Sequence, residues 1–218
     1  MKKLVFLVCS NGYGHYKRCL RVANKVLEIH NQIKIDFICN EKIHKIHSDW
    51  ILTKKMMSNR SFNFINGNST IELVKKNSKQ HIDYFGISWV DKKIINNADL
   101  VISDNISSFL IYRSDIVLMG SFLWSELIKK NKLSDKSKFE NLELSLIKKY
   151  RPEMIALKDM AMPYVMKYTR PFLTSWIVDK SFKISPRSKL KNILIIGGGT
   201  GYLDYELSKI LKKIDQTK

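Results

Sequence analysis

Residues 3–15 read KLVFLVCSNGYGH, and this stretch decides the fold. It opens on a continuous apolar run, Lys3–Cys9, which has the length and composition of a strand covered on both faces of a parallel sheet. After a glycine loop, apolar residues recur at helical spacing from about Tyr16 to His30. A second apolar run, Ile33–Cys39, completes a strand–loop–helix–strand unit. This order predicts an α/β fold with a parallel sheet and a right-handed crossover.

Apolar segments further along the chain extend the same pattern. A serine followed three residues later by glutamate, the capping-box pattern, predicts two helix starts. We expect helices at Ser69–Asn77, Ser107–Tyr112 and Ser137–Tyr150, and strands at Ala98–Ser103, Asp115–Met119 and Phe172–Val178.

The composition changes at residues 179–191, which read DKSFKISPRSKLK and are typical of a linker. Beyond it, a strand at Asn192–Ile196, the glycine loop Gly197–Gly201 and a helix begin a second unit. One strand and one helix cannot bury a core alone. We therefore divide the chain into a domain at 1–180, a linker at 181–191 and the start of a truncated second domain at 192–218.

The formal net charge of the 218 residues is +18, and the lysine pairs that produce it are scattered along the whole chain. Dispersed charge is typical of solvated faces, but a cationic surface also attracts lipid headgroups and phosphorylated substrates. Nucleic acid is not an expected partner, because no recognised binding motif accompanies the charge. No apolar run has the length of a membrane span, and the three cysteines are interpreted as core residues in a reducing cytoplasm.

The loop after the first strand contains the residues that could bind a ligand or take part in a reaction, namely Asn11, Gly12, Gly14 and His15. Backbone N–H groups and the positive end of the following helix converge there, which suits an anion such as a diphosphate. An imidazole at the same place can act as a base. The alternative is a tight turn that needs glycine, with His15 capping the helix. The spacing is not GxGxxG, so a dinucleotide cofactor is not expected, and no other cofactor is.

The segment from Gly12 to Leu20 resembles the GxGHxxRCL-type sequence of one branch of the GT-B glycosyltransferase superfamily, the family-28-like branch. This branch includes the peptidoglycan lipid-intermediate N-acetylglucosaminyltransferase and the UDP-sugar hydrolase of pseudaminic acid synthesis. Ala98–Asp104 is similar to their strand that ends in an acidic residue. Gly197–Gly201 is similar to the loop that opens their nucleotide-sugar-binding half.

The resemblance implies a Rossmann-like parallel-sheet domain of GT-B type in which His15 is the catalytic base. Asp104 would orient His15 or the acceptor, with a helix cap as the alternative role, and Arg18 would be a structural ion-pair partner. The donor phosphates would contact Gly198, Gly199 and Thr200. The paired acidic DxD motif is absent from the sequence, so no metal is expected.

The expected function is sugar transfer from a nucleotide donor, UDP-linked, to an envelope polysaccharide or glycolipid acceptor. UDP-sugar hydrolysis and a non-catalytic subunit of a split glycosyltransferase are the alternatives. From the cysteines and the cationic surface, we expect a cytoplasmic protein that is peripheral on the inner face of the plasma membrane. We expect the chain alone not to turn over a nucleotide sugar and to need a second-half protein, because its donor half is incomplete.

Three further segments allow two interpretations each. Met154–Met166 is either apolar surface for a lipid-linked acceptor or core, and Trp124 lines either the acceptor cleft or the core. His44 and His47 are three residues apart, but no third residue completes a metal-ligand pattern, so we interpret both as surface or hydrogen-bonded residues.

Overall fold

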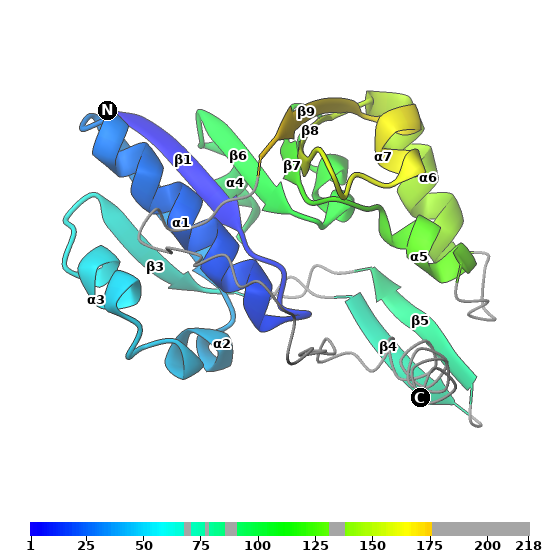
Figure 1. Cartoon of the computed structure of the whole chain (residues 1–218), viewed down its shortest axis with the longest axis horizontal. Helices are drawn as coiled ribbons and strands as arrows, with labels where there is room; N and C mark the ends of the chain where they lie inside the picture. The colour runs from blue at the N-terminus through cyan, green and yellow to red at the C-terminus, as the bar shows by residue number, and fades with distance from the viewer. Residues whose placement is uncertain (68–70, 77–78, 86–90, 131–137, 176–218) are drawn as a thin grey trace, which may run out of the picture. The chain divides into compact units, whose positions relative to one another are not determined.

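The computed structural model describes residues 1–67, 71–76, 79–85, 91–130 and 138–175. All of them lie in one compact unit, Met1–Ile177 (Figure 1). The predicted linker at 181–191 and the predicted second unit at 192–218 lie outside the described residues.

Among the described residues, seven strands form one sheet in which every neighbouring pair is parallel. They are β1 (Lys2–Leu7), β2 (Ile33–Cys39), β3 (Phe62–Asn66), β6 (Leu100–Asp104), β7 (Val117–Met119), β8 (Glu153–Leu157) and β9 (Arg170–Thr174). Their order across the sheet is β3-β2-β1-β6-β7-β8-β9. The predicted α/β class with a Rossmann-like parallel sheet is confirmed.

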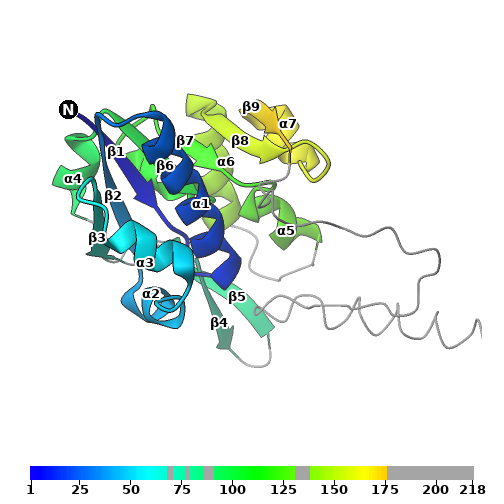
Figure 2. The ribbon, with the colours of Figure 1, turned by 60° about the vertical axis from the view of Figure 1, so that its left-hand side comes forward.

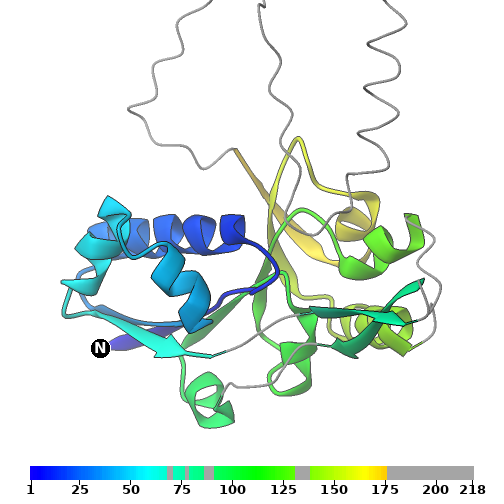
Figure 3. The same ribbon diagram turned by 90° about the horizontal axis from the view of Figure 1, so that it is seen from below.

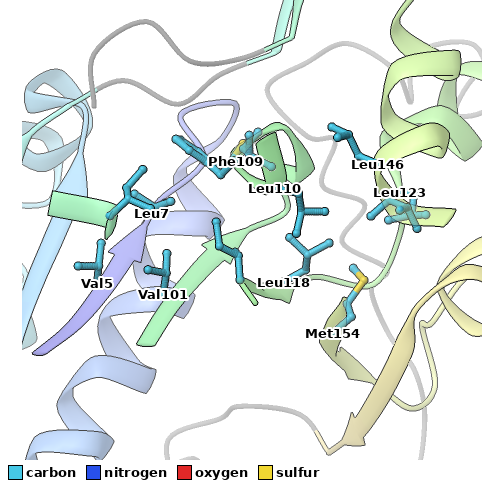
Figure 4. Packing of buried hydrophobic residues seen from close by; sticks show 14 of the residues in the cluster. Val5, Leu7, Val101, Phe109, Leu110, Leu118, Leu123, Leu146 and Met154 are labelled. Carbon is cyan, nitrogen blue, oxygen red and sulfur yellow. The ribbon is translucent and has the colours of Figure 1, made fainter. Parts of the chain in front are cut away.

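Helices cover both faces of this sheet. Their bounds are α1 (Tyr13–Ile29), α2 (Glu41–Ile46), α3 (Ile51–Met57), α4 (Lys92–Asn96), the 3-10 helix η1 (Ser107–Ile111), α5 (Trp124–Lys130), α6 (Lys138–Tyr150) and α7 (Pro163–Tyr168). The apolar residues of α1, α2 and α3 share one core cluster with the strands, and α1 lies on that side of the sheet in Figures 2 and 3. Those of α4, η1, α5, α6 and α7 belong to a second cluster (Figure 4).

Strand β1 shows why two cores form. Its alternate residues Leu4 and Phe6 pack in the cluster with α1, whereas Val5 and Leu7 pack in the opposite cluster. Successive strand residues point to opposite faces, so a strand that is apolar throughout must be covered on both sides. The uninterrupted apolar run in the sequence is the direct cause of this layered arrangement.

Helix α1 begins at Tyr13, earlier than the Tyr16 predicted from the apolar spacing. Its buried residues are Tyr16, Cys19, Leu20 and Ala23, and Gly12 is its N-cap. The first turn contains no buried apolar residue, so the periodicity could not reveal it. As a consequence, Gly14 and His15 belong to the first turn of the helix, not to the loop before it.

The helix predicted at Ser69–Asn77 is wrong over its described part. Ile71–Lys76 forms strand β4, which pairs antiparallel with β5 (Lys79–Phe85). The segment carries β-branched Ile71 and Val74, which favour a strand, and the paired backbone outweighs the capping-box signal. The paired residues are 3 to 14 positions apart, so the pairing depends on the neighbouring segment, which a cap pattern of four residues does not report.

Several other boundaries differ from the sequence predictions. β7 begins at Val117 instead of Asp115, and β9 begins at Arg170 instead of Phe172 and ends at Thr174. The sequence did not predict strands β3, β5 and β8 or helices α3, α4, α5 and α7. Met154–Met166, interpreted as apolar surface or core, contains most of β8 and the start of α7, and Met154, Ala156 and Val165 are core residues.

Candidate functional site

The order of the sheet reverses between β1 and β6. From β1 the chain runs outward through β2 to β3, and it then returns to β6 on the other side of β1. In open α/β sheets, ligands bind at the carboxyl ends of the strands where the order reverses in this way. His15 follows β1 and Asp104 is the last residue of β6, so the fold brings both to this edge of the sheet.

The imidazole of His15 lies against the start of α1. A Cβ built on Gly12 would be 3.4 Å from Cδ2 of His15. Gly12 itself has extended backbone, with φ of 178°, which any residue can adopt, and no side chain caps the helix. The alternative in which His15 caps the helix therefore has no support in this geometry.

His15 and Asp104 form a close pair. Nδ1 of His15 is 2.8 Å from Oδ2 of Asp104, whose side chain is 0% exposed, whereas that of His15 is 17% exposed. An ionised carboxylate only accepts hydrogen bonds, so Nδ1 of the ring carries the proton and donates it. This tautomer leaves the lone pair of a neutral ring on Nε2. The helix-cap alternative for Asp104 is not observed at η1, whose N-cap is Ile106.

Arg18 is the third member of the cluster. Nη2 of Arg18 donates to Oδ1 of Asp104, the oxygen that His15 does not use, and lies 3.2 Å from Nδ1 of His15. The sequence interpretation of Arg18 as an ion-pair partner agrees with this contact. Its partner, 86 positions away along the chain, could not be named from the helix alone.

Burial and charge act in opposite directions on Asp104. Loss of solvent raises the pKa of its carboxyl, but the charges and hydrogen bonds of His15 and Arg18 outweigh burial and hold this pKa below its ordinary value of 3.8. Asp104 is therefore an anion at neutral pH. A buried anion beside an imidazole holds the ring in one orientation and stabilises a proton gained at Nε2.

The three cysteines are free and buried, as the sequence analysis predicted for core residues. Burial raises the pKa of Cys9 and Cys19 far above the usual thiol value and that of Cys39 to about 12. The thiolate is the nucleophilic form of cysteine. These side chains consequently remain protonated and do not act as nucleophiles near neutral pH.

The remaining predicted residues of the first loop differ in their surroundings. Oδ1 of Asn11 accepts a hydrogen bond from the Cys9 thiol at 3.3 Å. A Cβ built on exposed Gly14 would meet no heavy atom of the described structure within 4 Å. Packing therefore does not require glycine at position 14. The predicted phosphate ligands Gly198, Gly199 and Thr200 lie outside the described residues.

Sequence reasoning missed Asn105 and Gly120, which follow β6 and β7 at the same edge of the sheet. Asn105 is buried and has a φ of 61°, in the left-handed region where asparagine is tolerated better than most residues. A Cβ on Gly120 would lie 2.9 Å from Oδ1 of Asn105, so only glycine allows this approach. In the sequence, the position of an asparagine directly after a buried strand could have indicated that Asn105 belongs to this site. Trp124 is a core residue, and its Nε1 donates to the Asn105 carbonyl at 2.9 Å.

Among the described residues, a hollow of about 570 Å³ lies at the starts of β1, β2 and β3, and two more lie beside β7, β8 and β9. One of about 20 Å³ adjoins Arg18 at the ends of β7, β8 and β9, where Gly120 and Thr174 line it. The other, of about 540 Å³, is lined by the first residues of β6, β8 and β9 and by Phe172, whose side chain is exposed. Since this hollow includes the starts of these strands, it lies toward the opposite end of the sheet from Asp104.

His44 and His47 contact Tyr16, a buried residue of α1. Nδ1 of His44 is 3.0 Å from the hydroxyl of Tyr16, and the ring of His47 stacks on the ring of Tyr16. Burial lowers the pKa of both imidazoles. Both are thus packed within the structure, and over the residues described here no cluster of histidine, cysteine, aspartate or glutamate could hold a metal ion.

The fold and the site define an α/β protein with a Rossmann-like sheet and a His–Asp–Arg cluster at its switch point. No protein-family model matches the chain, and a search of curated proteins finds no match either. Over the part of the chain that the structure describes, no helix is both long and apolar enough to cross a bilayer.

Proposed function

We propose that this protein is the acceptor-side part of a GT-B-type glycosyltransferase that uses a nucleotide sugar, UDP-linked, as donor. The observation that supports this proposal is the pairing of His15 with buried, ionised Asp104 at the switch point of the sheet. The pair leaves Nε2 of a neutral ring available to accept a proton, as a general base requires.

The chemical step assigned to His15 is removal of a proton from the acceptor hydroxyl. The hydroxyl oxygen forms a bond to the anomeric carbon of the donor sugar while the bond from that carbon to the diphosphate oxygen breaks. The proton moves to Nε2 of His15, and the nucleoside diphosphate leaves with the bonding electrons. Asp104 stabilises the resulting imidazolium through Nδ1–H, without itself taking the proton.

The donor phosphates are assigned to two glycine-rich stretches. Asn11, Gly12 and Gly14 lie at or just before the start of α1, where the helix dipole favours an anion, and we propose that they contact the donor phosphates. Gly198, Gly199 and Thr200 are proposed to supply N–H groups from the second glycine loop.

UDP-sugar hydrolysis is the second candidate, because the same His15–Asp104 pair would activate water in place of an acceptor hydroxyl. The third candidate is a non-catalytic subunit that binds a second-half protein. We also propose a cytoplasmic site of action on the inner face of the plasma membrane, with a glycan or lipid-linked acceptor. The net charge of +18 supports attraction to anionic headgroups.

One experiment separates the three candidates. The chain is incubated with UDP-sugars alone, with an added glycolipid extract, and with the extract plus the protein encoded by the adjacent gene. A transferase releases UDP only when the extract is present, and a hydrolase releases UDP and free sugar in equal amounts without it. If none of the three mixtures releases UDP, both enzymatic proposals are wrong.

Replacing the proposed base provides the corresponding residue test. In the active mixture, we expect His15→Ala to lower kcat by roughly 10²-fold or more, the usual scale for loss of a general base. The matched control is His30→Ala, because His30 is an exposed histidine at the other end of α1. Near-normal turnover by a folded His15→Ala protein would show that His15 is not the base.

A further inference from the structure

Arg18 and His15 reach the same carboxylate from the same side of α1. They are three residues apart, which places them on one face of the helix. His15 donates to Oδ2 of Asp104 and Arg18 donates to Oδ1, so each oxygen has its own donor. The thiols of Cys9, Cys19 and Cys39 lie nearby, and burial raises their pKa so that they are neutral.

A buried carboxylate with two different donors has a defined orientation. Asp104 has no exposed surface, so water cannot satisfy an oxygen that loses its protein partner. With Oδ1 held by Arg18, Oδ2 is the oxygen left for His15. Without Arg18, the carboxylate could turn and offer either oxygen to the imidazole, and the orientation of the ring would be less restricted.

We propose that Arg18 is a positioning residue that holds Asp104 so that His15 keeps its proton on Nδ1 and its lone pair on Nε2. The expected effect of Arg18 on catalysis rests on the proposed function, whereas its effect on the tautomer of the His15 ring does not. Arg18 acts through Asp104, and no contact between Arg18 and a substrate is required.

The contacts of Arg18 with the site are made through Nη2 of its guanidinium. Nε of Arg18 is buried and has no hydrogen-bond partner in the described part of the chain. A buried, unsatisfied donor costs free energy.

The test measures directly which nitrogen of the His15 ring carries the proton. Protein labelled with ¹⁵N at histidine is studied by long-range ¹H–¹⁵N NMR at mildly alkaline pH, where ordinary histidines are neutral. In the wild type we expect the His15 signals of a single tautomer, with a protonated Nδ1 and an unprotonated Nε2. No substrate is needed for this measurement.

Two variants of Arg18 are compared with one control. Arg18→Lys keeps the positive charge and is expected to fold, but its single flexible ammonium can bind either oxygen of Asp104. Arg18→Gln removes the charge and should have the larger effect. The control is Arg21→Lys, one turn further along α1, whose guanidinium carbon is 5.3 Å from the centre of the Trp50 ring.

We expect both Arg18 variants to show a mixture of His15 tautomers, and Arg21→Lys to keep the wild-type signals. In the active mixture, kcat should fall roughly 10-fold for Arg18→Lys while KM stays unchanged, because misalignment of a catalytic group acts on the transition state. A folded Arg18→Lys protein with wild-type His15 signals would overturn the proposal, whether or not Arg18→Gln folds. If the tautomers change but no mixture turns over a UDP-sugar, positioning stands and the proposed function fails.

Discussion

Asp104 shows how a single residue can combine complete burial with a full negative charge. Burial alone would keep its carboxyl protonated, yet His15 and Arg18 hold the pKa below its ordinary value of 3.8. A group whose pKa is lower in the folded state than in the unfolded state stabilises the fold above its unfolded pKa. This contribution is lost as the pH falls through the folded value.

This dependence of stability on pH predicts how the stability of Asp104→Asn differs from that of the wild type. At about pH 7 the variant should be less stable than the wild type by about 3 kcal/mol, because Arg18 loses its buried counter-charge. The difference should narrow as the pH falls from 3.8, the ordinary pKa of aspartate, through the lower pKa of the folded protein, because the unfolded chain binds the proton first and the folded carboxyl last. Urea unfolding of the variant and the wild type at neutral and acidic pH measures the difference in stability and its change with pH. The control Asp49→Asn changes an aspartate whose side chain is 95% exposed, and it should alter stability little at either pH.

At the scale of elements, the site depends on where neighbouring strands end. β1, β6 and β7 end at the same edge of the sheet, and their following residues lie close together. Asn105 after β6 fills the space that a side chain at position 120 would need. The approach of these two segments, more than any individual hydrogen bond, requires glycine at position 120.

Two glycine substitutions should therefore have opposite effects on stability. Gly120→Ala places a Cβ 2.9 Å from Oδ1 of buried Asn105, and we expect a loss of about 1–3 kcal/mol from this overpacking. Gly14→Ala meets no atom within 4 Å and lies in the first turn of α1, so a gain of up to about 1 kcal/mol is expected from helix propensity. Thermal unfolding of both variants and the wild type measures the two changes in stability. An equal change in Tm would contradict the packing argument.

At the scale of the whole molecule, the dominant feature is charge. Lysine and arginine number 38 against 20 aspartates and glutamates. Some of these charges are already paired on the surface, such as Lys45 with Glu41 and Lys54 with Asp49. The excess remains available to attract an anionic surface over a range set by the ionic strength.

We expect the protein to bind vesicles that contain phosphatidylglycerol more strongly than vesicles of phosphatidylcholine alone. Binding should weaken as salt is raised, because the attraction is electrostatic and screened. Co-sedimentation of the full chain with the two kinds of vesicle measures this directly. Equal binding to both kinds of vesicle, or binding that is insensitive to salt, would show that the lysines are solvated surface residues and do not attract the protein to an anionic membrane.

Local patterns determined a large part of this fold. The apolar run of β1, the spacing of buried residues in α1 and the second apolar run of β2 each lie within a few neighbouring residues. They were sufficient to predict a parallel α/β sheet and to place His15 where a strand passes into a helix. Asp104 could be predicted at the end of a strand for the same reason.

The tertiary structure decided which of these residues meet. His15 and Asp104 are 89 positions apart, and their contact exists only because the chain returns from β3 to place β6 beside β1. The sharing of Asp104 by His15 and Arg18 is long-range in the same sense, and the approach of Asn105 to Gly120 joins residues that follow two different strands. Hydrophobic periodicity reports which face of an element is buried, but the partner of that face is set by strand order and crossover, which no local pattern contains.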